Sequence, residues 1–192
     1  MKNWLEDLNK TLGLGLILAF IVFLVRGYYG ILGELSFWAF LFRWIHVVFG
    51  ILWIGLLYYF NFVQIPSMPK VPDEQKPAIT KVIAPAALFY FRWAAAGTVL
   101  FGLLTAGANG YLGHAVVLQP PVVTIGIGMW LAIIMAANVW FVIWPNQKKV
   151  LGLVDADAEA KKKAGRIALL ASRTNTMLSI PMLFCMVGQK LL

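Results

Sequence analysis

Four residues in one long apolar stretch have the types and spacing needed to bind a prosthetic group. Arg43, His46, Gly50 and Trp53 recur at steps of three and four, so a helix places them on one face. Histidine is a common axial ligand of b-type haem. The glycine leaves room for a flat porphyrin, the tryptophan packs on its ring, and the arginine pairs with a propionate. We therefore predict haem b as a cofactor, with His46 as the metal ligand.

Two alternatives stay open for this site. His46 can equally be interpreted as a histidine that is hydrogen-bonded between two helices. The second axial ligand is also open. The chain has one other histidine, His114, in the loop NGYLGHAVV. It either folds back over the bundle as a second metal ligand or is a residue of the membrane interface.

A second set of polar residues lies in later apolar stretches. Arg43, Arg92 and Arg173 each sit well inside such a stretch, whereas all eight acids lie in flanks and connections. An arginine within a membrane either reaches back to the headgroups or pairs with an anion. Asn138 and Asn175 have a depth similar to that of Arg92 and Arg173. These four residues either line one polar cavity, open to an anionic small molecule, or make ordinary hydrogen bonds between helices.

The elements that hold these residues are expected to be membrane-spanning helices. Of the 192 residues, 61% are apolar and 12% are charged, whereas about a quarter of a soluble domain is charged. A helix needs roughly 20 apolar residues to cross the hydrocarbon layer. Five segments qualify: about 11–31, 36–64, 84–107, 121–144 and 165–189. We predict an all-α integral membrane protein, a five-transmembrane-helix bundle in a single membrane domain over residues 1–192.

The ends of these helices are expected at particular residues. The first apolar segment resembles a signal peptide, but Glu6 and Asp7 dilute its charge and no A-x-A site follows, so we expect a retained membrane helix. It is long enough only if it continues past Arg26 through residues 27–32. We expect Pro66, Pro69, Pro72 and Pro77 to break the chain after the second helix and Pro145 to end the fourth.

The distribution of charge predicts the orientation in the membrane. The net charge is +8, and cations gather in cytoplasmic loops of membrane proteins. One predicted side carries Lys2, Lys10, Lys70, Lys76, Lys81, Lys148, Lys149, Lys161, Lys162, Lys163 and Arg166, and the other carries Arg26 and Lys190. We expect a multi-pass protein of the bacterial inner membrane with a cytoplasmic N-terminus and a periplasmic C-terminus. With little chain outside the lipid, no nucleic acid is expected as a partner.

Small residues predict how two of the helices pack. Gly128, Ala132 and Ala136 recur every four residues in the fourth segment. Ala164, Ala168, Ser172 and Thr176 do the same in the fifth. Such spacing lets helix backbones approach closely in lipid. We expect these two helices to pack on each other or on a partner subunit.

The stretch RWIHVVFGILWIG, Arg43 to Gly55, resembles the N-terminal membrane domain of the bacterial membrane-bound urate oxidase (urate hydroxylase) family. The matching positions are Arg43, Trp44, His46, Val47, Trp53, Ile54 and Gly55. FYFRW, residues 89–93, is more weakly similar to an aromatic-rich second motif. A fainter similarity is to the small haem-binding membrane oxidases of porphyrin synthesis. In the urate enzymes the membrane domain is fused to a cytochrome c. No C-x-x-C-H sequence is present here, so we expect a separate electron acceptor.

The leading functional expectation is a haem redox protein that oxidises a small molecule or passes electrons to a partner cytochrome. Whether it is an enzyme, an oxidoreductase, or an electron-transfer subunit stays open. One alternative is a non-catalytic accessory subunit of a larger membrane complex. The other is an anion carrier or channel that uses Arg92 and Arg173.

Overall fold

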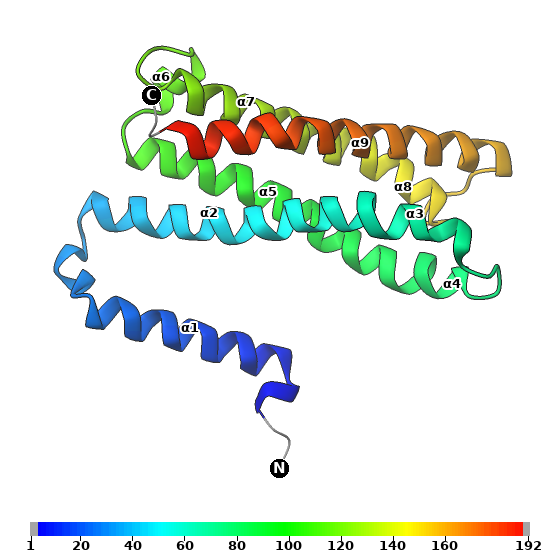
Figure 1. Cartoon of the computed structure of the whole chain (residues 1–192), viewed down its shortest axis with the longest axis horizontal. Helices are drawn as coiled ribbons and strands as arrows, with labels where there is room; N and C mark the ends of the chain where they lie inside the picture. Colours follow the sequence, from blue (N-terminus) through cyan, green and yellow to red (C-terminus); the bar gives the residue numbers. More distant parts are fainter. Residues whose placement is uncertain (1–3, 190–192) are drawn as a thin grey trace. The chain divides into compact units, whose positions relative to one another are not determined.

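A computed structural model describes residues 4–189 of the chain, which form helices and turns without any strand. The chain divides between Trp38 and Ala39 into two units. Figure 1 shows the helices, which are described for each unit separately.

The first unit contains one long helix, α1 (Leu8–Val25), between two short 3₁₀ turns, η1 (Trp4–Glu6) and η2 (Tyr28–Ile31). Asp7 starts α1, because its carboxylate accepts the backbone N–H groups of Asn9 and Lys10 at 3.0 and 3.3 Å. The predicted continuation of this helix through residues 27–32 is wrong. Gly27 has a φ of +71°, a left-handed conformation that ends the helix after Arg26.

The second unit holds the remaining helices, and α2 (Leu35–Tyr58) leads into it from the first. Its shorter elements are η3 (Tyr59–Gln64), α3 (Ile65–Ser67), η4 (Met68–Lys70), α4 (Lys76–Ala78), η5 (Ile79–Ile83), α6 (Leu112–Val116), η6 (Val139–Ile143) and α8 (Trp144–Val150). Its long helices after α2 are α5 (Ala84–Ala108), α7 (Val123–Asn138) and α9 (Ala158–Gly188).

Five continuous helical stretches are long and apolar enough to cross a membrane. They are Leu8–Val25, Leu35–Lys70, Lys76–Ala108, Val123–Val150 and Ala158–Gly188. The number and order agree with the five predicted spans, so the all-helical prediction with five helices of membrane-spanning length is confirmed for residues 4–189. The ends differ from the predicted ones by several residues.

Prolines explain most of the differences at the helix ends. Pro66, Pro85 and Pro145 each follow a π-helical turn, respectively η3, η5 and η6, by two residues. A proline lacks an N–H group and its ring collides with the carbonyl four residues earlier. In each π turn the hydrogen bond instead joins residues five apart, as from Ile65 N to Phe60 O. The wider turn accommodates the proline, so the predictions that Pro66 breaks the second helix and Pro145 ends the fourth are wrong.

The interior of the second unit is closely packed, and the prediction that α7 and α9 pack together is confirmed. The small residues of both predicted stripes are buried, apart from the half-buried Thr176. The closest approach is at Gly128, where an added Cβ would lie 2.9 Å from the Cβ of Cys185. A larger residue at position 128 would therefore push the two helices apart.

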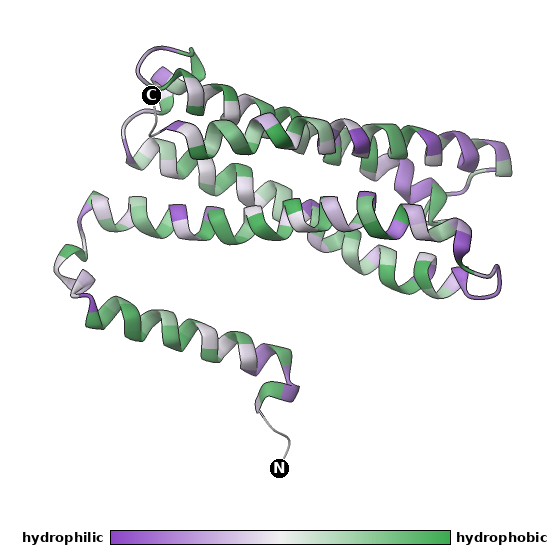
Figure 2. Ribbon diagram, in the orientation of Figure 1, coloured by the Kyte–Doolittle hydropathy of each residue, from purple (hydrophilic) through white to green (hydrophobic). Residues whose placement is uncertain are grey.

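One end of the second unit concentrates the polar residues. In Figure 2, hydrophilic colour gathers where α8 meets α9 and at the connection before α4. The cations there include Lys76, Lys148 and Lys161–163. This clustering is the pattern on which the predicted cytoplasmic side rests, and the orientation itself stays a prediction. Lys2 and Lys190 lie outside the described residues.

Candidate functional site

His46 lies on α2 and is hydrogen-bonded across to α5. Its Nδ1 atom is 2.7 Å from the carbonyl oxygen of Thr98. A carbonyl only accepts hydrogen bonds, so Nδ1 carries a proton, and in the neutral form of the ring Nε2 is the acceptor. The predicted alternative of a histidine hydrogen-bonded between helices is therefore confirmed. The same bond is also the usual support of a metal-binding histidine, because it fixes the tautomer and the ring orientation.

Glycines of α5 let aromatic rings of α2 approach its backbone. A Cβ at Gly102 would lie 2.9 Å from Nδ1 and Cε1 of His46, and one at Gly97 would lie 2.7 Å from the ring of Phe49. The sequence analysis did not assign a role to Thr98 or Gly102. The available signal was glycine inside an apolar helix, which often marks close helix contact.

Arg43 lies one helical turn before His46 and is exposed. Its Nη2 atom donates to Oδ1 of Asn109 at 3.3 Å, and the Asn109 amide nitrogen donates to the carbonyl of Thr105 at 2.7 Å. Burial raises the pKa of Tyr111, and the positive charge of Arg43 opposes that rise. Arg43 is therefore anchored by a neutral amide and leaves its charge free to meet an anion.

Gly50 and Trp53 face α5 and the protein interior. A Cβ at Gly50 would lie 3.8 Å from the methyl group of Thr98. Trp53 has no exposed surface and packs in the core, and its Nε1 atom is buried without a hydrogen-bond partner. The structure thus brings Arg43, His46 and Gly50 to one seam between α2 and α5, while the Trp53 ring lies within the core.

His114 is exposed on α6. None of the hydrogen bonds described for residues 4–189 joins it to His46. Within the same range, no group of three or more His, Cys, Asp or Glu side chains could hold a metal ion.

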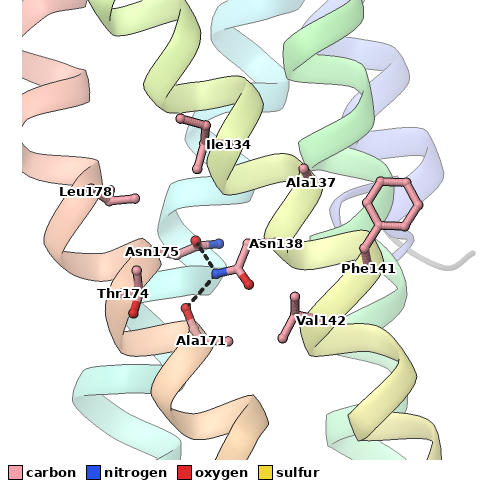
Figure 3. A pocket seen from close by; sticks show the side chains of 9 residues that line it. All are labelled: Ile134, Ala137, Asn138, Phe141, Val142, Ala171, Thr174, Asn175 and Leu178. Carbon is pink, nitrogen blue, oxygen red and sulfur yellow. Dashed lines mark hydrogen bonds between the residues drawn. The ribbon is translucent and has the colours of Figure 1, made fainter.

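Asn138 and Asn175 lie together between α7 and α9, as Figure 3 shows. Asn138 donates to Oδ1 of Asn175 at 2.8 Å and to the carbonyl of Ala171 at 2.9 Å. Asn175, fully buried, donates to the carbonyl of Met135 at 3.0 Å. They border a hollow of about 410 Å³. Its rim includes Phe141, which is 79% exposed, so the hollow opens at the surface of the bundle.

Arg92 and Arg173 are not among the residues that line this hollow. Arg173 is exposed on the outer side of α9. The guanidinium carbon of Arg92 lies 3.4 Å from the ring centre of Trp144 and 5.9 Å from that of Trp140. Tryptophans near the end of a membrane-spanning helix are ordinarily residues of an interfacial aromatic belt. The contact of these two tryptophans with Arg92 joins residues about fifty positions apart, so no local pattern indicated it.

Two further polar contacts join α2 and η3 to α9. The hydroxyl groups of Tyr58 and Ser179 are 3.0 Å apart. Asn61 donates to the hydroxyl of Ser172 at 2.8 Å, and its own Oδ1 atom is buried without a partner. These contacts explain much of the polar character of α9 as hydrogen bonding between helices.

Comparison with known families adds one finding. Residues 112–191 match the family model described as urate oxidase N-terminal. Over these residues, less than half of the chain, the protein is similar to that family. The match runs from the first residue of α6 past the end of α9, so the family resemblance is confirmed from a part of the chain that does not include Arg43 to Gly55. No curated protein and no solved structure matches the chain.

Proposed function

We propose that this chain is a membrane-embedded redox protein, related to the urate oxidase membrane domain, that binds a b-type haem through His46. It would act in the bacterial inner membrane, where it oxidises a small molecule or passes electrons to a separate cytochrome. The observation that carries the proposal is the bond between Nδ1 of His46 and the Thr98 carbonyl at 2.7 Å. The family match over residues 112–191 supports the redox assignment.

The α2–α5 seam offers one axial ligand for a haem iron, which is His46. With Nδ1 committed to Thr98, Nε2 is the atom available to iron, and Gly102 lets the ring lie against α5. Arg43, held by Asn109 one turn away, would meet a propionate. A bound haem supplies one-electron chemistry. His114 is exposed on α6, so the proposal takes a single ligand from this chain.

The test is an optical spectrum of the purified protein. The chain is produced in cells supplied with a haem precursor, and reduced-minus-oxidised spectra are recorded for the wild type, His46→Gln and His114→Gln. We expect an α-band in the wild type and in His114→Gln, and its loss in His46→Gln. A protein without the band, or a band unchanged in His46→Gln, would remove haem from the proposal.

The substrate is tested separately on haem-loaded membranes. Urate is the first compound to add, because the matched family is named for its oxidation. Reduction of the haem by urate in the wild type, and its absence in His46→Gln, would favour an oxidoreductase. A haem that urate leaves oxidised but that exchanges electrons with an added cytochrome would favour an electron-transfer subunit.

A further inference from the structure

Arg92 is a partly buried arginine with two covered nitrogen atoms that its surroundings do not satisfy. Its Nε and Nη1 atoms are buried and have no hydrogen-bond acceptor. Buried donors in folded proteins are nearly always paired, because an unpaired one loses its hydration without compensation. The salt bridge found among residues 4–189 joins Lys76 to Asp73, in the connection before α4. No acidic residue of the chain lies in the middle of a membrane-spanning stretch.

Trp144 fixes the place of this charge. At 3.4 Å from the ring centre, the guanidinium is within contact range of the indole, which attracts cations electrostatically. Trp140 adds a second ring at 5.9 Å. The guanidinium is thereby held against the indole rings of Trp140 and Trp144.

A second cation shares the same ring. The Nζ atom of Lys148, on the half-buried first turns of α8, lies 5.9 Å from the ring centre of Trp144. Two positive side chains near one indole repel each other electrostatically. An anion between or beside them would remove this repulsion and would accept the free N–H groups of Arg92.

We propose that Arg92, Lys148 and Trp144 form a binding site for a small oxyanion, a carboxylate or a phosphate group. The planar guanidinium donates to such oxygens with matched geometry, and the ammonium adds charge. Lys148 belongs to the cation-rich end of the bundle, so the anion enters from that end. Thr98, the partner of His46, lies six residues further along α5, about 9 Å at 1.5 Å per residue.

The oxyanion has two possible sources, and the experiment separates them. In the first arm, the protein is extracted in mild non-ionic detergent. Its mass is measured by native mass spectrometry to detect retained phospholipid. In the second arm, delipidated protein is titrated with inorganic phosphate and with acetate by calorimetry. Each arm uses the wild type, Arg92→Gln and the matched control Arg173→Gln, which removes an exposed arginine of a neighbouring helix.

We expect binding in one arm, at least tenfold weaker in Arg92→Gln and unchanged in Arg173→Gln. Retained lipid identifies a headgroup as the ligand, and calorimetric binding identifies a soluble anion. If Arg92→Gln fails to fold, Arg92→Lys and Lys148→Gln replace it, each with an expected several-fold loss. No binding in either arm, or binding that is equal in the wild type and in the variants at positions 92 and 148, overturns the proposal.

Discussion

The seam around His46 and the cluster around Arg92 look alike in the sequence and differ in the structure. Each is a cationic or titratable residue in an apolar helix. His46 has its Nδ1 atom bonded to the carbonyl of Thr98. Arg92 has its charge covered by Trp144 and two nitrogen atoms without acceptors. The difference shows that the neighbouring helix, more than the residue type, decides whether the hydrogen-bonding atoms of a polar side chain have partners within the protein.

The largest expected effect comes from filling the space beside His46. In Gly102→Leu the new side chain collides with the imidazole, because even its Cβ would lie 2.9 Å from the ring. Overpacking of this kind destabilises by about 1–3 kcal/mol. We expect a lower thermal midpoint and loss of any haem band. Gly107→Leu is the control, since an added Cβ there meets nothing within 4 Å. Equal behaviour of the two variants would mean that the α2–α5 contact is not tight.

Removing the ring over Arg92 is expected to have the next largest effect. Trp144→Leu keeps an apolar side chain but loses the attraction between indole and guanidinium, worth about 2 kcal/mol when desolvated. Thermal unfolding in detergent measures this loss. Phe141→Leu is the control, because Phe141 is 79% exposed on the same helical stretch. If both variants unfold alike, the stacking does not stabilise the bundle.

A smaller effect is expected where every polar group already has a partner. Asn175→Ala removes the bonds to Asn138 and to the carbonyl of Met135. Hydrogen bonds between membrane helices contribute about 0.6 kcal/mol on average, so a loss of about 1 kcal/mol is expected. Thr174→Ala, which alters an exposed hydroxyl bonded within its own helix, should be nearly neutral. A loss above about 3 kcal/mol would indicate a role beyond hydrogen bonding.

The smallest expected effect is electrostatic. Burial raises the pKa of Tyr111, and Arg43 opposes this rise, so Arg43→Gln should raise that pKa further. NMR titration with ring-labelled tyrosine, assigned through Tyr111→Phe, measures the shift. Because the folded pKa is raised, the contribution of Tyr111 to stability is present below its ordinary pKa of about 10. It is lost as the pH rises through the raised value. A pKa that falls in Arg43→Gln would contradict the geometry.

The sequence predicted the large-scale fold because apolar length and small-residue spacing are local signals. Five spans and the contact of α7 with α9 follow from them, as at Gly128. The contact between Asn138 and Asn175 could also be predicted, since the two residues have similar depth in adjacent helices. The partner of His46 could not be predicted, because the Thr98 carbonyl is a backbone group that every residue type carries. The contact of Arg92 with Trp144 depends on how two helices are rotated, which side-chain spacing within either helix does not specify.

The three π turns have a consequence for helical phase. Each turn that joins residues five apart holds one residue more than an α-helical turn, as from Trp144 N to Val139 O. One additional residue rotates every later side chain by about 100°. A helical wheel drawn through residues 123–150 at constant period therefore assigns Trp144 and Lys148 to the wrong direction. The stacking of Trp144 on Arg92 therefore depends on what is in effect a single-residue insertion within a continuous helix.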